Sequence, residues 1–289
     1  MTAHSLHPSS VSAPETSRIL VDTHVHIYDC FNLDTLLQSA WNNFSQQSDT
    51  SDFTGVLLLT ETARDHWFAK LSDKLKEADA NKGIKRGQWT FFSTAEACSL
   101  IAKNEQGQQL IIVAGRQIIT AEKLEVLALI TDSEFEEGLT LSETIQAIQV
   151  SGGVPVLPWG VGKWLGNRGT LIENLLNTQQ TSAQQTSAQQ PSFFIGDNSN
   201  RPQFWKRPSQ FSTIEQQGKP VLPGTDPLPI ASQASRPGSF GLSLSGTLNH
   251  ATPAQHLKEK LLSSHSRWEA YGDLEKPIPF FQNQLAMRM

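Results

Sequence analysis

The chain has 289 residues, which is enough for one large α/β domain or two ordinary ones. Apolar residues make up 38% and charged residues 18%, and this composition excludes a disordered acidic chain and a coiled coil. Lys and Arg number 23 against 28 Asp and Glu, a net charge of −5 without a basic block, so nucleic acid is not expected as the main partner.

The first segment, residues 1–18, is rich in Ser, Pro, Thr and His and lacks the apolar core of a signal peptide. We expect it to be a disordered N-terminal leader. No later run approaches the roughly 18 apolar residues of a membrane span, so no membrane partner is expected. The two cysteines, Cys30 and Cys98, lack CxxC spacing and cannot form a disulfide framework. This cysteine usage favours a reducing compartment, and we expect the cytoplasm.

Short apolar runs alternate with helix-like stretches from Ile19 onward, a pattern typical of a sheet covered by helices. The number of runs predicts a TIM-like (β/α) barrel of seven or eight strands that occupies residues 19–250. The predicted strands are 19–23, 55–60, 110–114, 124–129, 154–157, 193–195, 220–222 and 240–244.

Local sequence signals predict where some of the helices between these strands begin. Thr140 with Glu143, and Thr170 with Glu173, have the spacing of a capping box. Apolar residues at helical spacing in 67–75 predict a helix after the second strand.

Two segments differ from the predicted barrel. Residues 178–190 read TQQTSAQQTSAQQ, a polar low-complexity sequence that we expect to form a surface loop insertion without a catalytic role. Residues 251–289 are expected to form a C-terminal helical extension that packs on the barrel, with a helix opened by Pro253.

The strongest local signal is the pair His24 and His26 at the end of the first apolar strand. Alternation along a strand places both imidazoles on the same side. Imidazole nitrogens in this arrangement can both reach one divalent ion such as Zn, Mn or Fe. The alternative is that the two histidines are only partly exposed residues at a strand exit.

Glu125 interrupts the apolar run LEVLAL, which reads as a strand buried on both faces. An unpaired buried carboxylate costs several kcal/mol, so Glu125 needs a partner. A metal ion is one solution, and an ion pair with a residue such as Arg116 is the other.

Asp226 follows the apolar strand and Gly turn of VLPGTDP. Ligands in α/β proteins collect at the carboxyl ends of strands, so Asp226 is predicted as a further metal ligand. Its alternative role is to cap the turn that follows.

Other loops predicted at the same end of the sheet carry polar and cationic side chains. A cluster of guanidinium and ammonium groups there favours a substrate with a phosphate or a carboxylate. Packing of the loops by these side chains is the alternative. The candidates are Lys163 and Arg168 in the loop after 154–157, Asp197, Asn198 and Arg201 in the loop after 193–195, and Arg236 before the last strand.

The arrangement resembles the PHP-domain and amidohydrolase-like metal-dependent hydrolases, which are TIM-like barrels. The resemblance rests on His24, His26, Glu125 and Asp226, and it implies that these four residues are metal ligands. In these families further histidines lie on the middle strands, whereas this chain has none between His66 and His250. The set of metal-site histidines is therefore incomplete.

These observations predict a metal-dependent hydrolase, with a phosphoester preferred over an amide. A metal-activated water would attack a small anionic substrate. Asp197 or Asp226 would accept the proton, and Lys163, Arg168 and Arg201 would stabilise the developing oxyanion. Arg236 and Asn198 are expected to contact the substrate. No nucleotide cofactor is indicated, because the phosphate-binding fingerprints are missing. The alternative is a degenerate barrel that acts as a ligand-binding or interaction protein.

Overall fold

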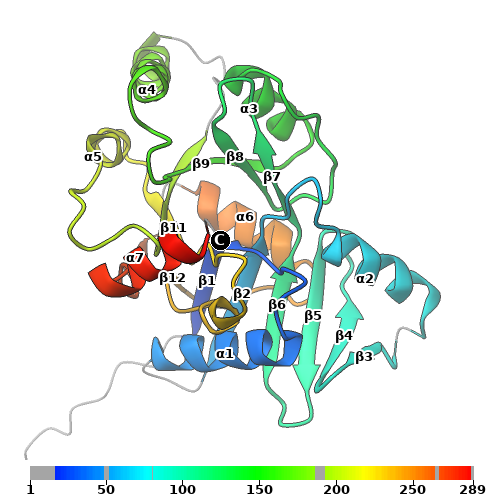
Figure 1. Ribbon diagram of the computed structural model, residues 1–289. Helices are drawn as coiled ribbons and strands as arrows, with labels where there is room; N and C mark the ends of the chain where they lie inside the picture. The colour runs from blue at the N-terminus through cyan, green and yellow to red at the C-terminus, as the bar shows by residue number, and fades with distance from the viewer. Residues whose placement is uncertain (1–16, 49–51, 80, 186–192, 264–266, 288–289) are drawn as a thin grey trace, which may run out of the picture.

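The computed structural model describes residues 17–48, 52–79, 81–185, 193–263 and 267–287. They form a mixed α/β fold with two open sheets (Figure 1). The strands of the larger sheet run in the order β13-β12-β1-β2-β6-β5-β4-β3, and those of the smaller sheet in the order β11-β10-β9-β8-β7.

The centre of the larger sheet is parallel and its margins are antiparallel. β1 pairs with β2, and β2 with β6, in parallel register, whereas β12 is antiparallel to β1. Parallel strands covered on both faces read as continuous apolar runs, and this is why they were visible in the sequence. The strands are β1 (Arg18–Val25), β2 (Phe53–Leu59), β3 (Ile84–Arg86), β4 (Trp89–Ser93), β5 (Ser99–Asn104), β6 (Gln109–Val113), β12 (Gly241–Ser245) and β13 (Trp268–Tyr271).

The smaller sheet combines three parallel strands with an antiparallel pair. β9, β10 and β11 are parallel to one another, and β8 is antiparallel to both β7 and β9. The strands are β7 (Gly115–Ile119), β8 (Glu125–Leu129), β9 (Val154–Pro158), β10 (Phe194–Asn198) and β11 (Val221–Gly224).

The predicted TIM-like barrel is wrong, because neither sheet is closed and the strands do not follow a repeated β/α order. β3, β4, β5 and β6 follow one another as antiparallel neighbours with no helix between them. Five strands were not predicted, namely β3, β4, β5, β7 and β13. Their sequences mix polar and apolar residues, so they lack the uninterrupted apolar runs on which the prediction relied.

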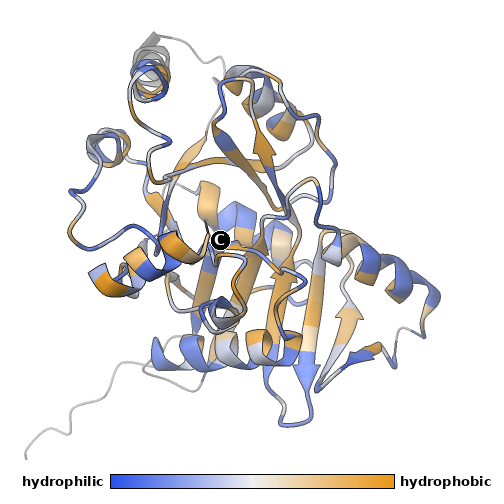
Figure 2. Ribbon diagram, in the orientation of Figure 1, coloured by the Kyte–Doolittle hydropathy of each residue, from blue (hydrophilic) through white to orange (hydrophobic). Residues whose placement is uncertain are grey.

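The structure describes seven α-helices, and its buried apolar residues form three clusters. One apolar cluster lies under α1 and α2, a second between the two sheets and α6, and a third under α3, α4 and α5. Figure 2 shows the central strands as mainly hydrophobic. The helices are α1 (Leu33–Gln46), α2 (Trp67–Glu77), α3 (Leu141–Val150), α4 (Asn167–Gln185), α5 (Ser209–Gln216), α6 (Pro253–Leu262) and α7 (Pro277–Ala286).

Three predicted boundaries change. The low-complexity segment 178–190 is not a loop throughout, because α4 continues to Gln185 and residues 186–192 lie outside the described part. Gln and Ala are good helix formers and allow a helix that has begun to continue. The extension 251–289 contains β13 as well as α6 and α7. Most of the predicted leader, residues 1–16, lies outside the described residues, and Arg18 already belongs to β1.

The local helix signals gave mixed results. Thr140 and Glu143 form the predicted reciprocal capping box at the start of α3. Pro253 occupies the first turn of α6 as predicted. The pair Thr170 and Glu173 does not start a helix, because α4 begins at Asn167. Among the described residues, no helix combines the length and the hydrophobicity that crossing a lipid bilayer requires.

The two sheets meet where the end of β1 contacts the end of β11. The hydroxyl of Thr23 donates to the carbonyl of Pro223 at 2.9 Å, and the backbone N–H of Asp226 donates to the carbonyl of His24 at 2.8 Å. Gly224 makes this approach possible, because a Cβ on it would lie 2.4 Å from the His24 nitrogen. The junction therefore depends on a position without a side chain.

We predict that Gly224→Ala destabilises the protein by about 3 kcal/mol, because the added methyl group must push the backbone of β1 away. Gly196→Ala, on the neighbouring strand β10, is the matched control. Its Cβ would meet first a side-chain methyl group of Val156 at 3.2 Å, and we expect a loss below about 1 kcal/mol. Urea unfolding of both variants measures the difference, and equal losses would contradict this account of the junction.

Candidate metal centre

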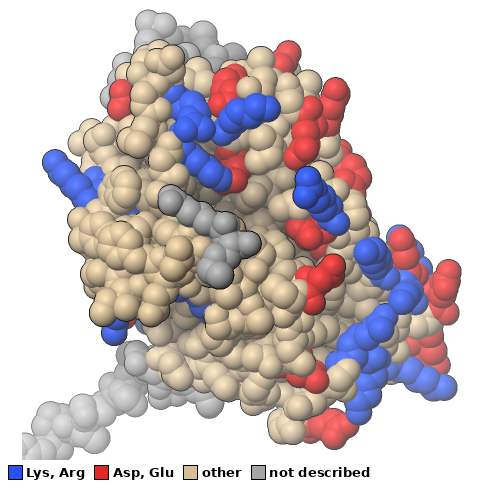
Figure 3. Space-filling model, in the orientation of Figure 1, with Lys and Arg blue, Asp and Glu red and all other residues tan. Residues whose placement is uncertain are grey.

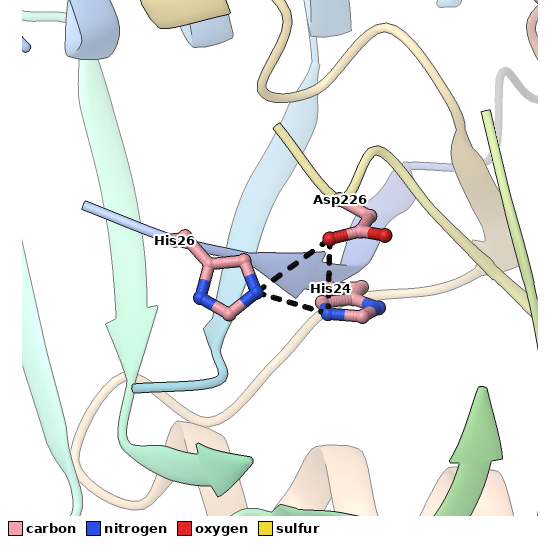
Figure 4. A group of neighbouring side chains, drawn as sticks. All are labelled: His24, His26 and Asp226. Atoms are coloured by element: carbon pink, nitrogen blue, oxygen red, sulfur yellow. Dashed lines mark hydrogen bonds and ion pairs between the residues drawn. The ribbon is translucent and has the colours of Figure 1, made fainter. Parts of the chain in front are cut away.

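Three side chains from the two sheets converge at this junction (Figure 4). His24 lies on β1, His26 follows the end of β1, and Asp226 follows β11. The Nε2 atoms of the two histidines are 3.1 Å apart. The Oδ1 atom of Asp226 lies 3.4 Å from Nε2 of His24 and 3.6 Å from Nε2 of His26. These atoms form the one cluster of metal-ligand type found among the described residues.

The spacing of the three donor atoms fits a small divalent ion. Ligand atoms about 2.0–2.1 Å from a tetrahedral zinc ion lie about 3.4 Å from one another. The three observed separations, 3.1, 3.4 and 3.6 Å, bracket this value. Two imidazole nitrogens and one carboxylate oxygen are also a donor set that zinc, manganese and iron accept. The residues present therefore fit the ion that the sequence predicted.

Asp226 is held in an unusual backbone conformation by several hydrogen bonds. Its φ is +47°, in the left-handed region that non-glycine residues rarely adopt. The side chain of Asn198 donates to Oδ2 of Asp226 at 3.0 Å, and the Asn200 side chain donates to the Asp226 carbonyl. Asn198 also donates to the carbonyl of Trp159 at 2.8 Å. Oδ2 is thus engaged by the protein, while Oδ1 faces the two imidazoles.

Asp22 organises the same junction from inside, and the sequence analysis missed it as a functional residue. It is completely buried, and one oxygen accepts the backbone N–H of Thr225 at 2.8 Å. The other oxygen accepts the Thr225 hydroxyl at 2.6 Å and the N–H of Gly238 at 2.8 Å. Burial raises the pKa of Asp22 to about 6, although these hydrogen bonds act in the opposite direction. The sequence offered one signal for Asp22, namely a carboxylate inside an apolar strand, two positions before His24.

Burial and neighbouring side chains give His24 and Asp226 the protonation states that metal binding needs. Burial lowers the pKa of His24 to about 4, so its imidazole is neutral at pH 7. Burial alone would raise the pKa of Asp226, but its interactions with His24, His26 and Lys163, which include a hydrogen bond from His26, outweigh this effect and hold the pKa well below its usual range. Asp226 is therefore a carboxylate at neutral pH.

Two further neighbours of the histidines were not predicted. Oε1 of Gln117, on β7, lies 3.3 Å from Nε2 of His24. The ring of Tyr28 stacks on His26, with a centroid distance of 5.2 Å.

Nδ1 of His26 and Oδ1 of Asn198 are buried and have no hydrogen-bond partner among the described residues. Buried polar atoms of native proteins are usually paired, so unpaired atoms at this position indicate a site that binds polar groups.

Glu125 is not part of the three-residue cluster. Its carboxylate forms an ion pair with Lys163, which supplies the partner that the buried strand required. The partner is therefore a lysine from the loop after β9 and not Arg116, which pairs with Glu61 and Glu134. Spacing favoured Arg116, which lies on the neighbouring strand β7, whereas Lys163 is 38 residues from Glu125 along the chain and reaches it only through the fold.

The predicted arginines are largely engaged within the protein. Arg201 binds both oxygens of Asp197, at 2.8 and 2.6 Å, and both side chains are buried. Arg236 pairs with Glu275 and donates to the hydroxyl of Ser199. Arg168 donates to two backbone carbonyls, those of Lys123 and Gly162. These contacts are the loop-packing role that the sequence left open for arginines beside Gly and Pro.

The comparisons with known proteins define the fold alone. No family model and no curated protein matches the sequence. Among solved structures, the chain is similar to the crystal structure of PsfC from Pseudomonas syringae PB-5123, with a TM-score of 0.54 and 12% sequence identity. The similarity covers 94% of this chain and 98% of that one. The arrangement of elements is therefore shared along nearly the whole length.

We predict that Zn²⁺ or Mn²⁺ stabilises the protein through this cluster. At a concentration a hundredfold above the dissociation constant, binding adds about 2.7 kcal/mol, which raises Tm by about 5 to 10 °C. His24→Ala and Asp226→Ala should abolish the shift, because each removes one of the three donors. His250→Ala changes an exposed histidine and should keep it. A shift that survives in His24→Ala would place the ion elsewhere.

The stability of the metal-free protein should also depend on His24 and pH. Since the folded pKa of about 4 is below the ordinary value of 6.5, the unfolded chain binds a proton that the folded protein does not. Stability is therefore complete above pH 6.5 and falls as the pH decreases towards 4. Between pH 7 and 4.5, wild type should lose about 2.5 kcal/mol more than His24→Gln, as measured by urea unfolding. Parallel losses in the two proteins would refute the assignment.

Proposed function

We propose that this chain is a metal-dependent hydrolase that acts on a small phosphoester. The observation that carries the proposal is the convergence of His24, His26 and Asp226 at the carboxyl ends of β1 and β11. In open α/β sheets the loops at strand carboxyl ends surround the ligand. A neutral, buried imidazole beside an ionised, partly exposed carboxylate is an arrangement suited to a divalent ion.

A divalent ion such as Zn, Mn or Fe supplies Lewis acidity, which lowers the pKa of water in contact with it towards about 7. The residues of the chain perform the remaining tasks. Nε2 of His24 and Nε2 of His26 are the nitrogen donors, and Oδ1 of Asp226 is the oxygen donor. Asn198 keeps Oδ2 of Asp226 fixed, so that Oδ1 remains directed at the imidazoles.

We assign the acceptance of the proton to Asp226. Asp226 is ionised at neutral pH, and its Oδ2, which accepts a hydrogen bond from Asn198 and is not the metal donor, is the oxygen to which we assign the proton of the water that attacks the substrate. Asp197, the other candidate, is engaged by Arg201 at both of its oxygens. We therefore assign to Asp197 the task of fixing the loop that carries Asn198.

Lys163 is the cation that we assign to the substrate anion. Its charge acts on both His24 and Asp226, and its side chain is 37% exposed, so it can move from Glu125 to an incoming phosphate. Figure 3 shows basic and acidic side chains interspersed on the displayed face, without a large area of one sign. Selection of an anion therefore depends on individual groups.

The second candidate function is a metal-containing or metal-free protein that binds a ligand without turnover. The internal pairing of Arg201 and Arg236 favours it, because these side chains are held away from an anionic substrate. For either function we propose a cytoplasmic location, since Cys30 and Cys98 are both free thiols.

The test is an assay of the protein, purified without chelator and analysed for bound metal, with phosphoester, amide and lactone panels. We expect phosphoester hydrolysis that requires the ion. Asp226→Asn should lower kcat/KM by about 10²- to 10⁴-fold. Lys163→Gln should raise KM about tenfold with little change in kcat, because it removes an interaction with the bound substrate. His250→Ala is the control and should keep full activity.

Two outcomes contradict parts of the proposal. A folded protein that binds the ion stoichiometrically but hydrolyses none of the three panels would favour the binding protein over the hydrolase. Preference for an amide or a lactone, with KM unchanged in Lys163→Gln, would retain the hydrolase and reject the phosphoester.

A further inference from the structure

The last described helix, α7, directs an apolar face towards solvent. Ile278, Phe281 and Leu285 recur at spacings of three and four residues, which places them along one side of the helix as the α7 stripe. Their exposed fractions are 72%, 62% and 63%. The other side of the helix holds Phe280, which is buried, and the polar Asn283. A surface helix normally turns its apolar side inward, so this stripe indicates a surface that a partner covers.

Phe204, from the segment after β10, extends the stripe. Its ring stacks on that of Phe281, with a centroid distance of 5.9 Å and an angle of 13° between the ring planes, and it is 54% exposed. The segment is tied to the start of α7, because the backbone N–H of Gln203 donates to the carbonyl of Glu275 at 2.9 Å. Contacts between two parts of the chain therefore fix the α7 patch, which consists of Phe204, Ile278, Phe281 and Leu285.

The α7 helix contains no charged residue. Its sequence, PIPFFQNQLA, includes neither an acid nor a base. On the face displayed in Figure 3, charged side chains gather mainly away from α7, whose place is given in Figure 1. Helices that lie on a lipid surface carry Lys and Arg on their polar side, whereas the cores of protein–protein interfaces are depleted in charged residues and enriched in aromatic ones. The composition of the α7 patch therefore favours a protein partner.

The area of the α7 patch is sufficient for the centre of a dimer interface. From their exposed fractions, the four side chains offer about 450 Å² of apolar surface, more than half of the roughly 800 Å² that each partner buries in a standard interface. Gln282 and Ala286, both exposed beside the stripe, add to this area. A second copy of the chain presents the same apolar surface, so two stripes can pack on each other about a twofold axis without burying an unpaired charge.

We propose that the α7 patch is the interface of a symmetric dimer of this chain. The α7 helices of the two copies lie antiparallel, stripe against stripe. Phe281 is the middle residue of the stripe, so it is placed near the twofold axis, where it meets its counterpart in the other copy. The proposal does not depend on the proposed hydrolase, because none of the residues of the patch belongs to the metal cluster.

The test is sedimentation equilibrium of the full chain from about 1 to about 300 µM, in chelator to exclude association through metal ions. We expect a reversible monomer–dimer equilibrium with a dissociation constant in the micromolar range, as suits a contact of this area. Phe281→Asp should weaken association about a hundredfold or more, because dimerisation would bury an unpaired charge. Val150→Asp is the matched control. It places the same charge on α3, at an apolar residue that is 82% exposed, and should leave the association unchanged.

A mixture of two variants tests whether the patch contacts its own copy. Phe281→Lys should be monomeric like Phe281→Asp. An equal mixture of the two should associate about tenfold more tightly than either variant alone, because opposite charges then meet near the twofold axis. Since Phe281 is 62% exposed, both variants should fold, which urea unfolding checks. If either does not fold, Ile278→Asp, at a residue that is 72% exposed, replaces Phe281→Asp in the comparison with wild type.

Four results would overturn the proposal. The first is a wild-type chain that stays monomeric over the whole concentration range. The second is a folded Phe281→Asp that dimerises as tightly as wild type, and the third is a mixture that associates no better than its components. The fourth is a monomeric wild type that binds phosphatidylserine vesicles through Phe281, which would identify a lipid surface as the partner of the patch.

Discussion

The buried carboxylate of Asp22 fastens β1 of one sheet to the chain that follows β11 of the other. It accepts hydrogen bonds from Thr225 and Gly238, two residues more than 200 positions away along the chain. These hydrogen bonds fix Thr225, the residue before Asp226, and so support the left-handed backbone conformation of Asp226 next to His24. Together with the close approach that Gly224 allows, these hydrogen bonds keep the chain after β11 beside the end of β1, where the three donor atoms meet. A charged group in an apolar interior is costly, and here its cost is offset by donors that saturate both oxygens.

Sequence patterns located the cluster better than they located the fold. Alternation alone placed His24 and His26 on one side of β1, and the Gly turn before Asp226 correctly indicated a strand end. The central strands were visible because burial on both faces demands continuous apolar runs. The same rule failed for β3, β4 and β5, because polar residues interrupt their apolar runs. The open mixed sheets were therefore mistaken for a barrel.

Long-range partners explain the other differences. Glu125 needed a cation, but whether Arg116 or Lys163 supplied it depends on how the loop after β9 folds back. Arg236 looked free because its partner Glu275 lies 39 residues away along the chain, whereas Asp197 is only four residues before Arg201 and this pair was within reach of sequence reasoning. Gln117 carries no motif, and its contact with His24 exists only because β7 lies beside the end of β1. Charge pairing across the fold is a property of topology, which local spacing does not encode.

The two imidazoles of the cluster and its carboxylate are about 200 residues apart along the chain, and this separation affects the order in which the site can form. During synthesis both imidazoles leave the ribosome long before the carboxylate that completes the set, so an ion cannot serve as an early nucleus for the folding chain. Closing a loop of about 200 residues is slow compared with local helix and hairpin formation. Acquisition of the proposed ion would then be a final step, which follows the joining of the first strand to the eleventh.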